Sequence, residues 1–376
     1  MAKIALYLAG GGARGAYQVG VLKAIADILQ VKQLPFAMVS GVSIGSVNAA
    51  ILAQHADDFF EGVAQLEDLW SHIHCQQIFN SSNYQVSKSV FRNLSNLVVR
   101  QSQSGHLLDT TPLHEFISNN IDFDRIRVNI SNHLLETMEV ISTCYETQQS
   151  ISFYQHSAAA FEDWEYPRHI SQRTEINKEH ILASSALPLF FPTVNIDGLH
   201  YGDGGMGLVA PLRGALRFNV DKILILGTRA LPRFRSINKV SDGDIGFAPI
   251  LGNMLNGLFL DNLDRDMEMV NRMNDIVKLL SVWKKRRSPW RPVETLHLRP
   301  TSNIGELAQS QYLTMPALLR ILLNVLGAQS HSGDLLSFLL FEKEFTRILI
   351  DLGYEDTWSS SDTVKAFFGK SSNSLR

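Results

Sequence analysis

The chain has 376 residues and is 45% hydrophobic and 19% charged, a composition typical of a globular protein with a sizeable core. Its formal net charge of −3 gives no overall attraction to nucleic acid or to an anionic membrane, so we expect no nucleic-acid partner. The two cysteines, Cys75 and Cys144, are far apart and imply neither a disulfide framework nor a zinc site.

The first predicted element is a short strand at residues 4–8, which leads directly into a glycine-rich loop. Only Lys3 precedes this apolar stretch as a basic residue, and the stretch is too short for a secretory signal peptide. No uninterrupted apolar run approaches the about 18 residues that a transmembrane helix needs. We therefore expect a cytoplasmic or peripherally membrane-associated protein, and the sequence leaves open an export route without a signal peptide.

The loop in "LAGGGARGAYQVG" contains Gly10-x-Gly12-x-x-Gly15, a spacing that can cradle a dinucleotide pyrophosphate. A helix is predicted over 15–29 and a second strand from "PFAMVS" at 35–40. A dinucleotide site needs an acidic residue at the end of that second strand, but the strand runs into "SGVS" without one. A nucleotide- or phosphate-binding protein therefore stays only as an alternative function.

The second strand runs into "GVSIG" at 41–45, which fits a nucleophile elbow, a serine on a sharp turn between a strand and a helix. The helix predicted over 44–54 directs its free N–H groups and its positive dipole end at the oxygen of Ser43. Because neighbouring parallel strands end at the same edge of a sheet, the N–H groups of Gly11 and Gly12 are placed to meet a developing oxyanion. The loop is thus predicted to hold an oxyanion rather than a phosphate.

The middle of the chain continues the alternation of strands and helices. The predicted elements are an Asn-, Ser- and Gln-rich insertion at 76–105, a helix starting at Thr111-Pro112 with Thr111 as N-cap and Pro112 at the first helical position, a hairpin of strands at Met138–Thr143 and from Ile151, a helix near 177–186, two strands around an Asp197-Gly198 turn, and a buried strand from Lys222.

The last third begins with a linker at 229–249, followed by a long amphipathic helix marked by apolar residues from Leu251 to Leu280. A strand at 294–298 and further helices complete the chain. We expect three parts, namely a catalytic core at 1–230, a linker, long helix and strand at 231–300 that complete or flank it, and a helical C-terminal region at 301–376.

A serine nucleophile needs a base. Twelve histidines occur, and none lies in a recognisable catalytic context, so none is assigned. Asp203 in "YGDGG" is the stronger candidate, because it follows a hairpin and Gly204 and Gly205 allow the backbone to approach closely. A plain turn aspartate is the alternative interpretation of this stretch.

Several stretches in the same order resemble the patatin-like phospholipase family. They are "GGGARGAYQVGVL" at 10–22, "GVSIGSVNA" at 41–49, "ASSALPLFFP" at 183–192 and "DGG" at 203–205, with weaker similarity in "LLDTTPL" at 107–113 and "LFLDNLDRD" at 258–266. The resemblance covers roughly residues 3–300. It implies a three-layer α/β/α sandwich with a mainly parallel central sheet, extended here by a helical C-terminal region.

The resemblance also implies a Ser–Asp dyad without histidine, in which Ser43 is the nucleophile and Asp203 the base. Gly10, Gly11, Gly12 and Arg14 would form the oxyanion element, although we interpret Arg14 as structural or phosphate-facing rather than directly catalytic. The residues that would support these motifs are Gly15, Gly41, Gly45, Gly204 and Gly205. No metal or organic cofactor is implied. We interpret Ser184 and Ser185 as small packing residues of an apolar helix, and the basic run at 284–287 as a solvated helix end.

The resulting hypothesis is a serine acyl hydrolase that cleaves fatty-acyl esters of phospholipids or lysophospholipids through an acyl-enzyme intermediate. Its substrate would come from a membrane or a micelle by transient interfacial contact, and the need for an activating protein stays open. The alternatives are a nucleotide- or phosphate-binding protein that uses the Gly10–Gly15 loop, and a non-catalytic partner-binding protein on the same fold.

Overall fold

The computed structural model describes residues 2–80, 106–158, 160–231 and 247–369, apart from residues 260, 282, 285–287, 289, 317–319, 321–322 and 324–332. Its strands are β1 (Ile4–Leu8), β2 (Met38–Val42), β3 (Thr137–Cys144), β4 (Gln149–His156), β5 (Glu165–Tyr166), β6 (His169–Arg173), β7 (Val194–Ile196), β8 (Leu199–Asp203), β9 (Lys222–Leu226) and β10 (Glu294–Leu298). Its α-helices are α1 (Ala16–Leu29), α2 (Ile44–Gln54), α3 (Phe59–Ser71), α4 (Cys75–Ile78), α6 (Thr111–Asn120), α7 (Phe123–Ser131), α8 (Lys178–Ser184), α9 (Arg213–Arg217), α10 (Phe247–Phe259), α11 (Asp261–Leu279), α13 (Ile304–Ser310), α15 (Gly333–Leu339), α16 (Lys343–Ser359) and α17 (Ser361–Phe367).

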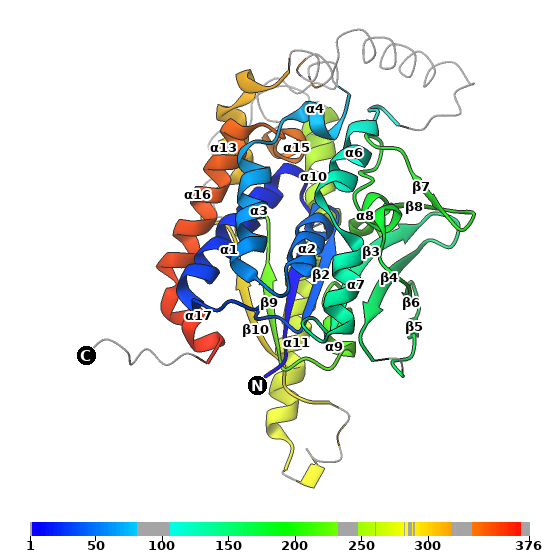
Figure 1. Cartoon of the computed structure of the whole chain (residues 1–376), viewed down its shortest axis with the longest axis vertical. Coiled ribbons are helices and arrows are strands. Elements are labelled where there is room, and N and C mark those ends of the chain that lie inside the picture. Colours follow the sequence, from blue (N-terminus) through cyan, green and yellow to red (C-terminus); the bar gives the residue numbers. More distant parts are fainter. Residues whose placement is uncertain are drawn as a thin grey trace.

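The strands form one sheet in the order β10-β9-β1-β2-β3-β4-β6-β5, with β8 pairing to β3 and β7 to β8. The pairs from β10 to β3 are all parallel, and β3 pairs antiparallel with both β4 and β8. Helices cover both faces of this sheet, so the molecule is a three-layer α/β/α sandwich with a mainly parallel sheet (Figure 1). The predicted fold class is thereby confirmed.

The central strands are apolar on both faces because both faces are covered. On the face toward α1 and α2, Leu6, Leu8 and Val39 belong to the larger core cluster. On the opposite face, Tyr7 and Met38 belong to a second cluster, together with residues of α9 and α11. This burial fixes the positions of the strand ends, where the chemically interesting residues lie.

Most predicted elements are confirmed, and the helix at 44–54 has the predicted bounds. The predicted cap of α6 is wrong: its N-cap is Thr110, and Pro112 occupies the second helical position. The reason is that Asp109 Oδ1 accepts hydrogen bonds from both the N–H and the hydroxyl of Thr111, which therefore does not act as the cap.

Other differences concern elements that were not predicted and the helix expected at 251–280. The elements that were not predicted are β5, β6, α3, α4, α7 and α9. The run at 251–280 is described as two helices, α10 and α11, and residue 260 between them lies outside the described residues. Residues 81–105 of the predicted insertion at 76–105 lie outside the described residues. So do residues 232–246 of the predicted linker at 229–249.

The C-terminal helices pack on the first helix of the chain. A Cβ added at Gly20 of α1 would lie 1.9 Å from the carbonyl oxygen of Ile350, and one added at Gly353 of α16 would lie 2.2 Å from that of Tyr17. Only glycine permits such a backbone approach. The α1–α16 contact therefore joins the two ends of the sequence in one core, as Figure 1 shows.

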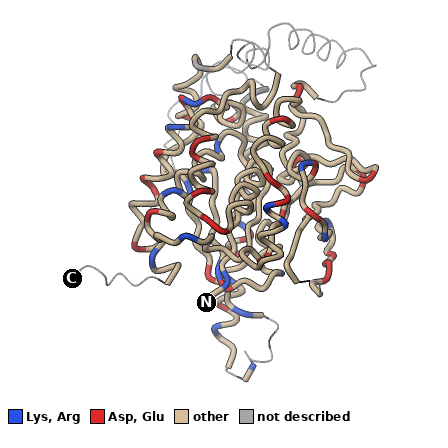
Figure 2. The backbone as a smooth tube through the Cα atoms, viewed as in Figure 1, with Lys and Arg blue, Asp and Glu red and all other residues tan. Residues whose placement is uncertain are grey.

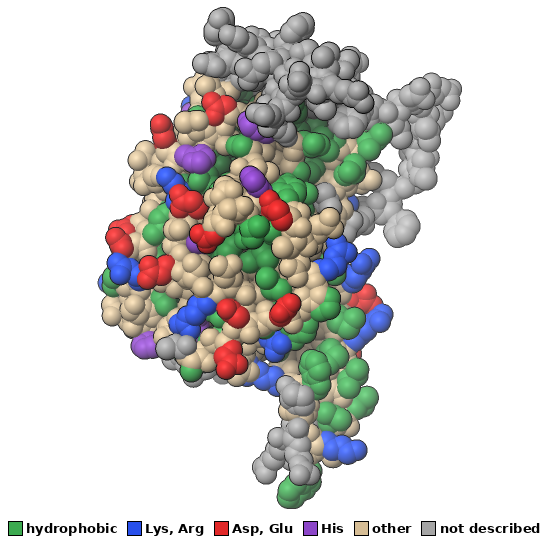
Figure 3. All heavy atoms as spheres, turned by 90° about the vertical axis from the view of Figure 1, so that its right-hand side faces the viewer, with side chains coloured by type: hydrophobic (Ala, Val, Ile, Leu, Met, Phe, Trp, Pro, Cys, Tyr) green, Lys and Arg blue, Asp and Glu red, His purple; other side chains and the backbone are tan. Residues whose placement is uncertain are grey.

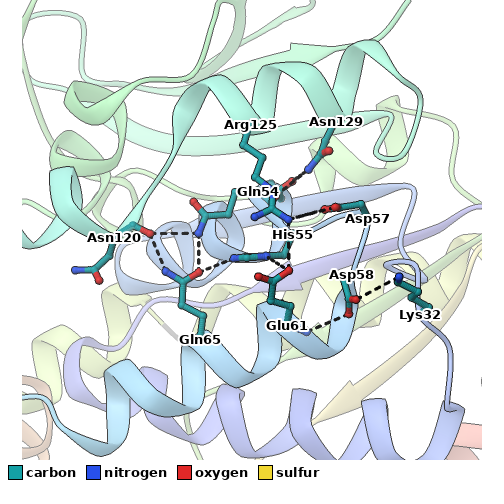
Figure 4. A network of polar contacts seen from close by, with 11 residues as sticks. Lys32, Gln54, His55, Asp57, Asp58, Glu61, Gln65, Asn120, Arg125 and Asn129 are labelled. Atoms are coloured by element: carbon teal, nitrogen blue, oxygen red, sulfur yellow. Dashed lines mark hydrogen bonds and ion pairs between the residues drawn. The ribbon is translucent and has the colours of Figure 1, made fainter.

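A polar network fixes the C-terminal end of α2 (Figure 4). Asn129 Nδ2 donates to the carbonyl oxygens of Ala53 and Gln54, both at 2.9 Å. Gln54 Nε2 also donates to Gln65 Oε1 (2.7 Å), which contacts His55 Nε2 at 2.6 Å. These bonds satisfy carbonyl groups that a helix end leaves unpaired and hold α2 against α3 and α7.

In the view of Figure 2, basic and acidic residues are interspersed over the outer helices, in keeping with the small net charge. Within the described residues, none of the helices combines the length and the apolar character that a bilayer crossing requires.

Candidate active site

Ser43 stands on a sharp turn between β2 and α2. Its φ of 55° is unusual for a residue with a side chain, and such strain is found most often at functional sites. The neighbouring glycines make the turn possible: a Cβ at Gly41 would lie 2.3 Å from the carbonyl oxygen of Gly45, and a Cβ at Gly45 would lie 2.2 Å from that of Leu8. Ser43 is therefore held at the first turn of α2, with only 6% of its surface exposed.

The glycine loop lies beside this turn because β1 and β2 are parallel neighbours. Gly11 and Gly12 have φ values of 152° and 58°, and a Cβ at Gly12 would lie 2.1 Å from the carbonyl oxygen of Phe338. Gly12 begins the 3₁₀ helix η1 (Gly12–Gly15), whose first N–H groups have no partner within the helix. Gly12 and Ser43 line the same small cavity, so the start of η1 lies beside the serine turn.

Buried amide side chains connect the loop to α2. Gln18 Nε2 donates to the carbonyl oxygen of Ala9 (2.8 Å), and Asn48 Nδ2 donates to Gln18 Oε1 (2.9 Å). Trp70 Nε1 donates to Asn48 Oδ1 at 2.9 Å. The sequence analysis missed this network, although Gln18 and Asn48 lie within the two quoted motifs and polar side chains inside apolar helices were its signal.

Thr228, which follows β9, holds other residues of the loop. Thr228 Oγ1 donates to the carbonyl oxygen of Gly10 at 2.6 Å, and a Cβ at Gly11 would lie 2.7 Å from the same hydroxyl oxygen. Gly15 packs against α2, since its Cβ would lie 2.9 Å from Ile44 Cγ2. The loop is thus held between β9 and α2 in one conformation.

Arg14 is fully buried, and its guanidinium is bonded to residues of the C-terminal part of the chain. Nε donates to Ser337 Oγ (2.8 Å), Nη1 to Asn256 Oδ1 (3.0 Å) and Nη2 to the carbonyl and carboxylate oxygens of Asp334 (3.2 and 3.1 Å). The guanidinium also stacks on the ring of Phe338, with its carbon 4.3 Å from the ring centroid. These contacts give Arg14 a structural position, and the charge that a phosphate in this loop would need is already paired.

Asp203 ends β8 and is fully buried. Its Oδ1 accepts a hydrogen bond from the N–H of Gly205 at 2.9 Å, and a Cβ at Gly204 would lie 2.1 Å from the carbonyl oxygen of Ile141. Gly204 is therefore required where the motif has it, and Gly205 contributes its backbone N–H.

Burial raises the pKa of Asp203 to about 7, although hydrogen bonding from the Ser43 hydroxyl and the Gly205 N–H favours the charged carboxylate and opposes the rise. Oδ2 has no partner with full hydrogen-bond geometry among the described residues, so it is available to the Ser43 hydroxyl. A carboxylate with a pKa near 7 accepts a proton more readily than an ordinary aspartate.

Ser184 corrects the interpretation of residues 184 and 185 as packing residues. Its Oγ accepts a hydrogen bond from the N–H of Ser43 (2.9 Å) and donates one to the carbonyl oxygen of Ile141 (2.6 Å). Ser184 thus connects α8, β3 and the serine turn. Ser43 and Ser184 are 141 residues apart in the sequence, so no local pattern predicted this hydrogen bond.

The cavity at Ser43 is small and mainly apolar, with a volume of about 30 Å³. Its walls include Ile78 of α4, Phe191, and Phe338 and Phe341 around α15. A volume of this size holds about one water molecule. The site is therefore a buried hydroxyl next to a buried carboxyl, with the glycine loop beside it and apolar walls.

A second serine–carboxylate pair lies three residues earlier in β2. Ser40 Oγ donates to Glu139 Oε2 at 2.6 Å, and the two residues are register partners in β2 and β3. Burial raises the pKa of Glu139 as well. This carboxylate packs under α9, where a Cβ at Gly214 would lie 2.2 Å from Glu139 Oε1. Neither Ser40 nor Glu139 lines the cavity at Ser43.

The described residues contain no group of three or more His, Cys, Asp or Glu side chains arranged to bind a metal ion.

Comparison with known proteins gives three findings. A family model described as patatin-like phospholipase matches residues 6–216. A segment of 54 residues is 46% identical to "Lysophospholipase nte1" of Aspergillus terreus, and this match covers 14% of the chain and 3% of that protein. The crystal structure of VipD from Legionella pneumophila aligns with 96% of this chain and 67% of its own, at 14% identity and a TM-score of 0.39.

Proposed function

Because the chain belongs to the patatin-like phospholipase family, we propose that it is a serine acyl hydrolase that cleaves phospholipid or lysophospholipid esters through a Ser43–Asp203 dyad. The observation that carries the proposal is the buried carboxyl of Asp203, whose pKa is raised to about 7 and which interacts with the Ser43 hydroxyl. Ser40 and Glu139, the second serine–carboxylate pair, do not line the cavity at Ser43.

In the acylation step, Asp203 takes the proton of Ser43 Oγ as that oxygen forms a bond to the ester carbonyl carbon. The carbonyl oxygen becomes an oxyanion, which the N–H groups of Gly11 and Gly12 stabilise. The bond between carbon and the alcohol oxygen then breaks, and Asp203 returns the proton to the departing alcohol. An acyl-enzyme on Ser43 is the product.

In the deacylation step, a water oxygen bonds to the acyl carbon while Asp203 takes a proton from that water. The bond to Ser43 Oγ then breaks, and the proton returns to Oγ, which releases the fatty acid. Gly10 and Arg14 contribute through the conformation of the loop, since Thr228 binds the Gly10 carbonyl and Arg14 is bonded to Asp334.

A lipid substrate is supported by the apolar walls around Ser43 and by the similarity of a short segment to a lysophospholipase. The chain spans only 3% of the length of that relative, so its activity enters here solely as part of the proposal. Lipid would reach the site from a membrane or micelle by transient contact.

The experiment that tests the proposal is labelling with a fluorophosphonate probe, followed by mass mapping of the modified residue. We expect one adduct on Ser43, lost in Ser43→Ala and strongly reduced in Asp203→Asn. Ser40→Ala is the matched control, because it removes a buried, carboxylate-bonded serine from the same strand and should label normally. An adduct elsewhere, or none on a folded protein with or without lipid micelles, would overturn the assignment.

A further inference from the structure

The cavity at Ser43 is too small for the substrate that its chemistry requires. Its volume of about 30 Å³ fits one water molecule, whereas ligand pockets usually measure about 300–1,000 Å³. A second cavity, of about 280 Å³, lies between α6, α8 and the segment at 191–195. Leu113, Ser185 and Phe191 line both cavities, so these side chains form the boundary between them.

The larger cavity changes character along its length. Near the boundary, its walls are the buried side chains of Leu113, Leu182 and Phe191. At the outer end, the walls are polar, and Glu179 and Asn195 are exposed. The cavity therefore runs from an apolar inner end near Ser43 to a polar opening at the surface.

Ser185 is the polar group at the boundary. Its side chain is 7% exposed, and its Oγ has no hydrogen-bond partner among the described residues. An unpaired buried hydroxyl costs free energy unless a ligand or water uses it. The neighbouring Ser184, by contrast, has its hydroxyl bonded to both Ser43 and Ile141. Ser185 is thus the free hydroxyl that faces a substrate passing between the cavities.

The loop that carries Phe191 is strained. Leu189 has a φ of 68° and is 53% exposed, although leucine rarely adopts a left-handed backbone. The N–H groups of Leu107 and Leu108 hold this loop by donating to the carbonyl oxygens of Leu189 and Phe190 at 2.9 and 2.8 Å. Figure 3 shows this side of the molecule, where hydrophobic side chains lie exposed between polar ones. The strain supports a functional position for Phe191.

Resting on the proposed function, we propose that the larger cavity binds the alcohol half of the ester, with Leu113 and Phe191 as the barrier and Ser185 as a positioning residue. The polar opening suits a glycerol-type alcohol, whose hydroxyl and head group stay hydrated while its ester reaches inward. The apolar walls at Ile78, Phe338 and Phe341 then face the acyl half. When the alcohol leaves through the open cavity, water enters by the same path for deacylation.

Two series of esters test this assignment. The alcohol series holds butyrate constant and varies the alcohol from methanol to glycerol to glycerophosphocholine. The acyl series holds p-nitrophenol constant and varies the acid from butyrate to laurate. For each variant we compare kcat/KM ratios within a series, because ratios cancel uniform changes in the amount of active protein.

Phe191→Ala widens the boundary, so we expect the glyceryl-to-methyl ratio to rise by about threefold or more, with the laurate-to-butyrate ratio unchanged. Phe161→Ala is the matched control, because Phe161 packs against the core cluster on the opposite face of the sheet, and it should change neither ratio. If Phe191→Ala does not fold, as judged by thermal unfolding, Phe191→Leu replaces it with the same expected direction.

Ser185→Ala removes a hydrogen bond to the alcohol half, so kcat/KM for glyceryl esters should fall about tenfold while methyl esters are unaffected. Ser185→Thr keeps the hydroxyl and should restore most of the loss. A shift in the acyl series alone, or an equal change for all esters, would overturn the inference while leaving the Ser43 assignment intact. Absence of any Ser43-dependent hydrolysis in the unmodified protein would overturn both.

Discussion

Two serine–carboxylate pairs are buried at serines three residues apart, Ser40 and Ser43, and the proposed function uses only the pair at Ser43. Ser40 donates to Glu139 in the middle of two paired strands, and the carboxylate packs under α9. Ser43 faces Asp203 at the strand end, on a strained turn that opens to a cavity. Both carboxyl groups are fully buried and have raised pKa values.

Under the proposed function, a buried carboxylate beside a hydroxyl is not sufficient for an active serine. The pair at Ser40 already has its hydrogen bond made, and the backbone around it is regular strand. Each pair leaves one carboxylate oxygen without a hydrogen-bond partner among the described residues, but only the pair at Ser43 lies at a helix N-terminus and beside the glycine loop. Position at the carboxyl edge of the parallel strands supplies these extra features.

The largest contrast is expected on removing the two hydroxyls. Ser43→Ala should lower kcat/KM for lipid esters by at least about 10³-fold, because the nucleophile is lost. Ser40→Ala should stay within about threefold of the unmodified protein, since Ser40 lines no cavity at the site. Steady-state kinetics on both variants measure the contrast, and equal losses would remove the distinction between the pairs.

The next contrast concerns stability. Asp203 has a native pKa of about 7 against 3.8 for an unperturbed aspartate, so the native state binds more protons between these pH values and loses stability as pH rises through them. Above a pH of about 7, this ionisation lowers the free energy of unfolding by about 4 kcal/mol.

Asp203→Asn removes this ionisation. We expect the variant to be inactive and, relative to the unmodified protein, more stable near pH 8 than near pH 5. Urea unfolding at both pH values measures the difference. If the difference in stability between Asp203→Asn and the unmodified protein is the same at both pH values, burial does not destabilise the charged form of Asp203.

A smaller effect is expected in the pH–rate profile. Because the base must be unprotonated, kcat/KM should rise tenfold per unit below the pKa of about 7 and level off above it, a change of about 100-fold from pH 5 upward. Glu139→Gln should keep the same inflection, since that carboxylate lies outside the site. A shift of the inflection in Glu139→Gln would show that the two pairs are coupled.

The smallest effect is expected at Ser184, which bonds to Ser43 but not to Ser40. Ser184→Ala leaves the N–H of Ser43 and the carbonyl of Ile141 without their partner, at a cost of about 1–3 kcal/mol in stability. We expect kcat to fall about tenfold with KM nearly unchanged, because the serine turn is less firmly oriented. Ser184→Thr retains the hydroxyl and should recover most of the rate.

The fold and the motif positions could be predicted because they depend on local patterns. Gly41 and Gly45 are both required within a single turn. The strand–helix–strand connection predicts that β1 and β2 are neighbours in the sheet. Whether Ser43 and Asp203 perform the proposed chemistry stays a prediction until labelling is done.

What could not be predicted depends on contacts between distant parts of the chain. Ser184 looked like a packing residue because its partners, Ser43 and Ile141, come from other elements. Nothing in the strand around Glu139 distinguishes a buried acid from an exposed one, since strand alternation leaves either face available. The two cavities likewise arise only when α6, α8 and α15 are packed together.

The pairing of Arg14 with Asp334, 320 residues away, affects how the protein is made. As the chain leaves the ribosome, the glycine loop emerges 320 residues before the carboxylate that neutralises Arg14. A buried guanidinium without its counterion is strongly unfavourable, so the loop cannot take its final form earlier. We therefore expect the glycine loop to reach its final form only after the segment around Asp334 has been made, which delays any chemistry at Ser43 until then.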